Sequence, residues 1–192
     1  DSPDFNKIKK LIEVMTGILQ DKLYIEQLSE AISLSEKTET GKYAPFFSLS
    51  NIKGEKITRS SEDFKKKNLL INFWASWGDS ISNHQSNTEL KQKYKKNKHI
   101  AMLGISLDMD KQEWQDAIKR DTLNWEQVCD FGGLNSEVAK QYAIKQVPSN
   151  ILLSADGKIL AKNLKGEQLK KKIEEVVTAA EEKEKQDNKK KK

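Results

Sequence analysis

The chain of 192 residues contains one cysteine, Cys129, and only two histidines, His84 and His99. A single cysteine excludes any disulfide bond within the chain, and it says little about the redox compartment. These three side chains show no metal-ligand spacing, so we expect neither a metal site nor a cofactor. No apolar run approaches the roughly 18 residues that a membrane-spanning helix needs.

Arginine is scarce as well. Of the 34 basic residues only Arg59 and Arg120 are arginines, the residue type best suited to forked recognition of phosphate groups. The terminal lysines, residues 189–192, supply four of the five net positive charges, so the body of the chain is nearly neutral. Because a lysine-rich end is usually solvated, we expect no nucleic-acid partner.

Helical periodicity dominates the first forty residues. Apolar residues recur at helical spacing from Phe5 to Ile32, with Gly17 as a candidate break. Such a stripe must pack on something, and we expect it to contact the main domain, another domain or a second chain. The chain starts at Asp1 without a methionine, which leads us to expect that a preceding segment has been removed.

The rest of the chain alternates between strand and helix patterns. A hairpin is predicted around Gly54, a short capped helix at residues 60–64, and a strand covered on both faces at "LLINFWA". Further strands are expected at "IAMLGISL", "QVCD", "NILLS" and "KILAK", with helices between them and a last helix from about Glu167. This order predicts an α/β fold, a mixed sheet flanked by helices with an N-terminal β-hairpin.

Three regions follow from these patterns. Residues 1–40 are expected to form an additional N-terminal helical segment with a linker, and residues 41–180 the main domain. Residues 181–192 are expected to form a charged, disordered tail.

Four segments, taken in order, give the chain a specific resemblance: "YAPFFSLSNIKGEKI", "LLINFWASW", "QVPSNILLSADGKILAK" and "GEQL". Over about residues 42–177 it resembles the thioredoxin-like thiol:disulfide oxidoreductases of bacterial envelopes, the TlpA/ResA-like branch near the AhpC/TSA superfamily. The resemblance implies a thioredoxin-like fold, a cis peptide bond before Pro148 beside the active-site loop, and a place in the cell envelope, periplasmic or lipid-anchored.

The chain departs from this family at the motif that carries its chemistry. The family has Cys-x-x-Cys directly after the position of Trp77, whereas this chain has Gly78, Asp79, Ser80 and Ile81. Disulfide exchange needs one thiolate that attacks a sulfur atom and a second thiol that resolves the mixed disulfide. Glycine has no side chain, isoleucine carries only hydrocarbon, and the hydroxyl of serine stays neutral. This degenerate loop therefore predicts the loss of dithiol chemistry.

Other roles for the loop are less favoured. We interpret Asp79 and Ser80 as helix-capping residues, and the charge of Asp79 would repel an anion from the helix end. Ser80 and His84 could meet on one helical face, but a hydrolase triad also needs a separately anchored acid and an oxyanion hole.

Three hypotheses for function remain open. In the first, the protein is redox-inactive and binds an extended peptide or a protein partner in a groove formed by Trp77, the degenerate loop, Val147 and Pro148. In the second, it is an oxidoreductase, thiol-disulfide or antioxidant, that uses Cys129 alone or with thiols supplied in trans. That role requires an accessible, acidified thiol, whereas a cysteine in a predicted strand usually behaves as a small buried hydrophobe. In the third, the fold is a structural module docked through its N-terminal helix.

Overall fold

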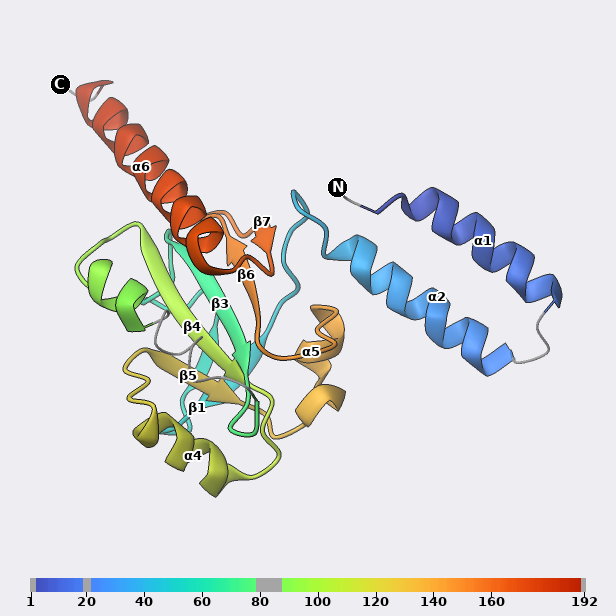
Figure 1. The fold of residues 1–192 in the computed structure, drawn as a ribbon. Helices are drawn as coiled ribbons and strands as arrows, with labels where there is room; N and C mark the ends of the chain where they lie inside the picture. Colours follow the sequence, from blue (N-terminus) through green and yellow to red (C-terminus); the bar gives the residue numbers. More distant parts are fainter. Residues whose placement is uncertain (1–2, 19–21, 79–87, 191–192) are drawn as a thin grey trace.

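A computed structural model describes residues 3–18, 22–78 and 88–190. Its centre is a seven-stranded mixed sheet with the strand order β2-β1-β5-β4-β3-β6-β7, shown in Figure 1. The strands are β1 (Ser48–Asn51), β2 (Lys56–Thr58), β3 (Asn68–Trp74), β4 (Ile100–Ser106), β5 (Glu126–Cys129), β6 (Ser149–Leu153) and β7 (Ile159–Lys162). The helices are α1 (Phe5–Ile18), α2 (Lys22–Lys37), α4 (Lys111–Arg120), α5 (Glu137–Gln141) and α6 (Gly166–Lys190). Residues 88–93 are also helical, and the predicted α/β class is confirmed.

Strand β3 lies between β4, with which it runs parallel, and β6, with which it runs antiparallel. All seven of its residues are buried, as the apolar run predicts. Successive side chains of a strand point to opposite faces of the sheet, and here Ile71 and Phe73 enter one apolar cluster while Leu70 and Trp74 enter another. The sheet therefore has two cores, one on each face.

Each core is closed by helices. Helix α5 covers one face through Val138 and Ala139, together with Tyr142, whose hydroxyl donates to the carbonyl oxygen of Pro45 at 2.7 Å. The other face is covered by α4, α6 and the helical residues 88–93 (Figure 1). The side chains that fill this second core from the helices are Leu90, Trp114, Ala117, Leu169, Ile173 and Val177.

Residues 59–67 form consecutive turns, so the short helix predicted at residues 60–64 is wrong. The side chain of Arg59 organises this segment. Its Nη1 donates to the carbonyl of Phe64 at 2.5 Å and its Nη2 to that of Lys67 at 2.6 Å. Nη2 also reaches the carbonyls of Ser154 and Ala155, at 3.2 and 3.0 Å, in the turn after β6. These contacts hold residues 59–67 in turns and connect them to the turn after β6.

Helix α6 continues to Lys190, beyond the point where the composition predicts a disordered tail. The side chain of Glu184 explains the difference, because it accepts from Lys98 Nζ at 2.6 Å and lies 3.3 Å from His99 Nε2. One turn earlier, Glu181 accepts from Asn97 Nδ2 at 3.1 Å. These contacts hold the charged helix against the segment before β4, which local composition cannot reveal.

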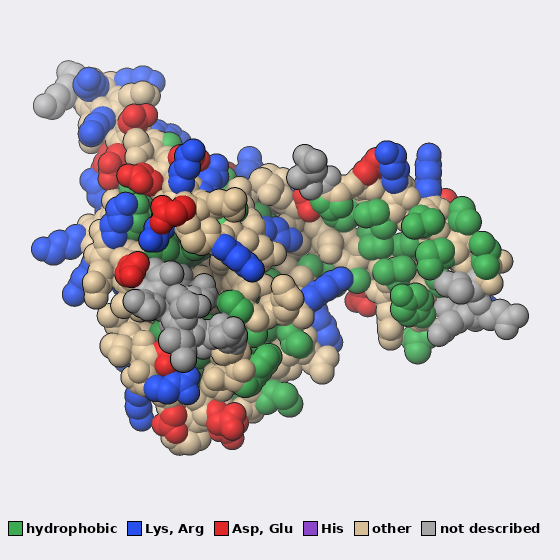
Figure 2. Space-filling view, in the orientation of Figure 1, with side chains coloured by type: hydrophobic (Ala, Val, Ile, Leu, Met, Phe, Trp, Pro, Cys, Tyr) green, Lys and Arg blue, Asp and Glu red, His purple; other side chains and the backbone are tan. Residues whose placement is uncertain are grey.

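The N-terminal segment forms two helices, α1 and α2, that lie side by side and antiparallel, apart from the sheet (Figure 1). Ile12 and Ile25 are buried in this hairpin. Five large apolar side chains of the hairpin are exposed: Leu11, Val14, Ile18, Leu23 and Tyr24. Figure 2 shows hydrophobic side chains gathered over this part of the molecule. The expectation that this stripe packs on another domain or chain stays a prediction. Within the described residues, no helix has the length and apolar character that crossing a membrane requires.

The connector from the hairpin to the sheet runs along β7. The amide of Gly41 donates to the carbonyl of Ile159 at 2.8 Å, and the amide of Ile159 donates to Lys42 at the same distance. Tyr43 forms an antiparallel bridge with Lys158. This segment therefore adds a short stretch of backbone pairing to the edge of the sheet. It also fixes the point at which the helical hairpin joins the main domain.

Replacing Arg59 by alanine should lower the free energy of unfolding by about 1–3 kcal/mol, because several backbone carbonyls lose a charged donor at once. Arg120→Ala is a matched control, since Arg120 is exposed and bonds only to the adjacent Asp121 among the contacts that the structure describes. Its effect should stay within about 0.5 kcal/mol. Urea denaturation measures both values, and equal losses would contradict the role assigned to Arg59.

Candidate functional site

The candidate site lies where β3 and β4 end. After Trp74 the chain turns through Ala75 to Gly78, and the amide of Gly78 donates to the carbonyl of Ala75 at 3.1 Å. Trp77 is 59% exposed, so its indole stands free on the surface at this end of the sheet. The remaining loop positions named from the sequence, Asp79 to Ile81, and also His84, lie outside the described residues.

The segment Val147-Pro148 lies beside this turn. Its peptide bond is cis, as the family resemblance implies. A Cβ atom built on Gly78 would lie 3.4 Å from Val147 Cγ2 and 3.3 Å from the carbonyl oxygen of Ala75. The structure thus brings together Gly78 and Val147, which are far apart in the sequence. A side chain at Gly78, where the family carries its first cysteine, would therefore fit tightly against Ala75 and Val147.

The buried carboxylate of Asp108 fastens the turn to the end of β4. Its Oδ1 accepts from the amide of Ser76 at 2.9 Å and from the hydroxyl of Ser76 at 2.6 Å. Its Oδ2 accepts from the hydroxyl of Ser106 at 2.6 Å. A buried carboxylate needs such donors, because an unpaired charge in the interior is costly. Sequence analysis missed Asp108, because a single aspartate after an apolar strand reads as an ordinary loop residue.

Cys129 lies at the end of β5, directly behind this network. The residue is 2% exposed, its Sγ accepts from the amide of Phe131 at 3.3 Å, and its thiol donates to the carbonyl of Asp108 at 3.6 Å. Burial raises the pKa of the Cys129 thiol to about 11. The second hypothesis requires an accessible and acidified thiol, and this thiol is neither.

Trp74, the last residue of β3, is a core residue. It is 2% exposed, and its Nε1 donates to Gln127 Oε1 at 3.0 Å. As for metals, the described part of the chain contains no group of three or more His, Cys, Asp or Glu side chains that could hold an ion. The site therefore consists of an exposed indole, a turn without sulfur and the segment at Pro148.

The sequence profile of the family described as Redoxin matches residues 39–179. This chain belongs to the redoxin family. The redoxin is 30% identical over 166 residues to a protein named thiol-disulfide oxidoreductase ResA from Bacillus cereus, a match that covers 86% of this chain and 90% of the relative. The resemblance to the TlpA/ResA-like branch is thereby confirmed.

Two solved structures are closely similar to this redoxin. One is the C-terminal domain of a putative thiol-disulfide oxidoreductase from Bacteroides thetaiotaomicron, with 76% identity and a TM-score of 0.70, covering 74% of this chain and 99% of that one. The other is a thiol-disulfide oxidoreductase from Bacteroides fragilis, with 57% identity and a TM-score of 0.69, covering 70% and 99%. The thioredoxin-like fold is therefore shown by comparison as well as by topology.

The thiol of Cys129 should resist alkylation in the folded redoxin. With its pKa at about 11, the thiol keeps its proton at neutral pH, and the thiolate fraction at pH 8 is roughly one in a thousand. The rate with iodoacetamide should rise only as the pH approaches 11 or when the protein is unfolded. A Gly78→Cys, Cys129→Ala variant serves as a control and should react readily at pH 8. Fast alkylation of the native Cys129 at pH 8 would overturn this assignment.

Proposed function

We propose that this chain is a thioredoxin-like protein that has given up disulfide exchange and binds an extended peptide or a protein partner beside Val147-Pro148. The observation that carries the proposal is the closeness of Gly78 to Val147. The turn at Gly78 lies beside the cis peptide bond before Pro148, and this chain carries no cysteine at residues 78–81. The relatives that this chain resembles are named thiol-disulfide oxidoreductases.

The absence of exchange follows from the chemistry of sulfur. Attack and resolution require two thiols that can reach a substrate, and this chain contains one cysteine in all. That cysteine is buried and its pKa is raised, so it is a poor nucleophile. A second thiol supplied in trans would still have to reach Cys129 through the packed end of the sheet.

Peptide binding is supported by the backbone around the cis peptide bond. Within the part of the chain that the structure describes, neither the amide nor the carbonyl of Val147 makes a backbone hydrogen bond. An extended peptide could pair with both groups, as strands do when they add to a sheet. Trp77, one residue before Gly78, offers an exposed apolar and aromatic area, and tryptophan is enriched among the residues that dominate binding energy.

We further propose that the protein works in the cell envelope, on the strength of its resemblance to oxidoreductases of bacterial envelopes. Fractionation of the source cells measures this directly. Recovery of the protein in the cytoplasmic fraction alone would reject the proposal.

Restoring the sulfur atoms should restore exchange. The unmodified protein should not accelerate the reduction of insulin by dithiothreitol, whereas Gly78→Cys, Ile81→Cys should accelerate it at least about tenfold, because both thiols return to the family's positions. The matched control is Gly78→Ser, Ile81→Ser, which adds similar volume without sulfur and should stay inactive. Turnover by the unmodified protein would contradict the proposed loss of chemistry.

Peptide binding is tested with the carboxymethylated B chain of insulin, an extended polypeptide without free thiols. Trp77→Ala should weaken its affinity about tenfold, because the variant removes the exposed indole one residue before Gly78. Leu23→Ala removes a similarly exposed apolar side chain on α2 and should leave affinity unchanged. Fluorescence anisotropy of labelled peptide gives both constants, with and without reductant. If neither Trp77→Ala nor Ile81→Asp weakens the affinity for the peptide, the peptide binds elsewhere on the protein.

A further inference from the structure

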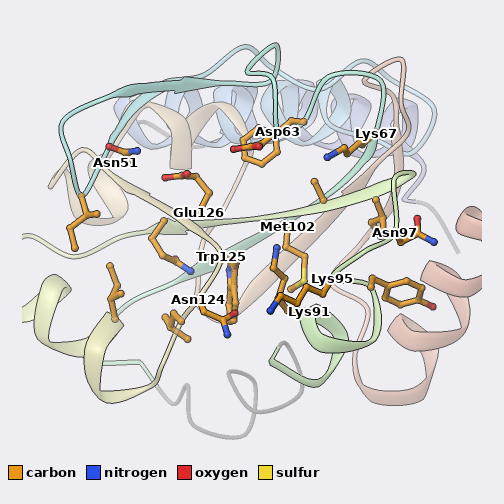
Figure 3. A pocket seen from close by; sticks show the side chains of 18 of the residues that line it. Asn51, Asp63, Lys67, Lys91, Lys95, Asn97, Met102, Asn124, Trp125 and Glu126 are labelled. Carbon is orange, nitrogen blue, oxygen red and sulfur yellow. The ribbon is translucent and has the colours of Figure 1, made fainter.

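A cavity of about 490 Å³ lies at the amino-terminal ends of β3, β4 and β5, opposite the end that carries Gly78. Lys67 stands directly before β3, Ile100 begins β4 and Glu126 begins β5, and all three line the cavity. The segment that follows the helical residues 88–93 forms one wall, and Ile118 of α4 contributes to another. Figure 3 shows the cavity from close by. The volume is typical of sites for small molecules, roughly 300–1,000 Å³.

Lysine ammonium groups are concentrated in this lysine cavity. Lys67, Lys91 and Lys95 all line it, and none of them forms an ion pair among the residues that the structure describes. Figure 3 shows the side chains of Lys91 and Lys95 next to each other, directed toward Trp125. Burial and then the charge of Lys67 lower the pKa of Lys91, and the charge of Asp63 opposes this shift by a smaller amount.

Two residues that line the cavity are largely buried: Trp125 is 7% exposed and Gln127 is 4% exposed. The orientation of Gln127 is fixed, because its Oε1 accepts from Trp74 Nε1. Among the described residues neither Trp125 Nε1 nor Gln127 Nε2 has a hydrogen-bond partner, and both nitrogens are enclosed by protein atoms. A ligand in the cavity therefore meets other atoms of these two residues and not the two nitrogens.

The lining also has a flat apolar part. The indole of Trp125 stands beside the side chains of Met102, Ile100 and Leu123, which belong to the second core or border it. Two carboxylates, Asp63 and Glu126, line the cavity as well, and Figure 3 shows Asp63 on the same wall as Lys67, across from Lys91 and Lys95. Positive charge and an aromatic face therefore come together at Lys91, Lys95 and Trp125.

We propose that the lysine cavity binds a small organic anion that carries at least two negative charges and one planar ring, of the size of a nucleoside diphosphate. The charged groups lie against Lys91 and Lys95, and the ring packs on the indole face of Trp125. This inference does not rest on the proposed peptide binding, because the two sites occupy opposite ends of the same strands.

Isothermal titration of the full chain with ADP tests the proposal, with inorganic pyrophosphate and adenosine as separate probes. ADP should bind, pyrophosphate should bind at least about fivefold more weakly, and adenosine should not bind detectably, since each lacks one part of the recognised group. Raising the salt concentration should weaken the binding of ADP. No binding of ADP or pyrophosphate at millimolar concentration would overturn the proposal.

Matched variants locate the binding. Lys91→Gln should weaken ADP at least about fivefold, whereas Lys96→Gln should change it less than about twofold, because Lys96 is exposed and does not line the cavity. Trp125→Phe keeps an aromatic ring but reduces the area on which the ring of the ligand packs, and it should weaken ADP more than pyrophosphate. Melting temperatures confirm that each variant is folded. Equal weakening by Lys91→Gln and Lys96→Gln would show diffuse attraction to a basic surface and would reject the site.

Discussion

Backbone pairing of β3 with β4 and β6 positions every other functional part of the molecule. In this register Trp74 lies opposite Ser106, and Phe73 lies opposite Ser149, one residue after Pro148. The turn at Gly78, the carboxylate of Asp108 and the cis peptide bond therefore meet at one edge without any covalent link. Since all of β3 is buried, a slip of one residue would exchange the two apolar faces and displace the site as a whole.

The pattern of residues predicts the architecture well, and for a clear reason. An apolar run such as "LLINFWA" has few alternatives to a central strand, and the turn at Gly54 needs a residue that tolerates a positive φ of 84°. The identity of the site came from motif resemblance, which located both Pro148 and the missing sulfur atoms. Local composition does not reveal the contacts of Glu184 with Lys98 and His99, because they join segments far apart in the sequence.

Sequence analysis found neither Asp108 nor the lysine cavity, because the residues that meet at each end of the strands are far apart in the sequence. Asp108 reads as an ordinary loop residue until its oxygens are seen to accept from Ser76 and Ser106. The lysine cavity is harder still to foresee. In a chain with 34 basic residues, no local signal separates Lys67 and Lys91 from the solvated majority. Only the fold places Lys91 beside the indole of Trp125, as Figure 3 shows.

The connector that runs along β7 has a consequence for how these molecules behave in a crowded solution. An open sheet has two edge strands, and the unpaired backbone groups of each can pair with a strand of another chain and start aggregation. Residues 41–44 already pair with the backbone at the edge of β7. The opposite margin, β2, is only three residues long and carries Lys56, a charge that discourages stacking. Both edges of the sheet are therefore protected against edge-to-edge aggregation.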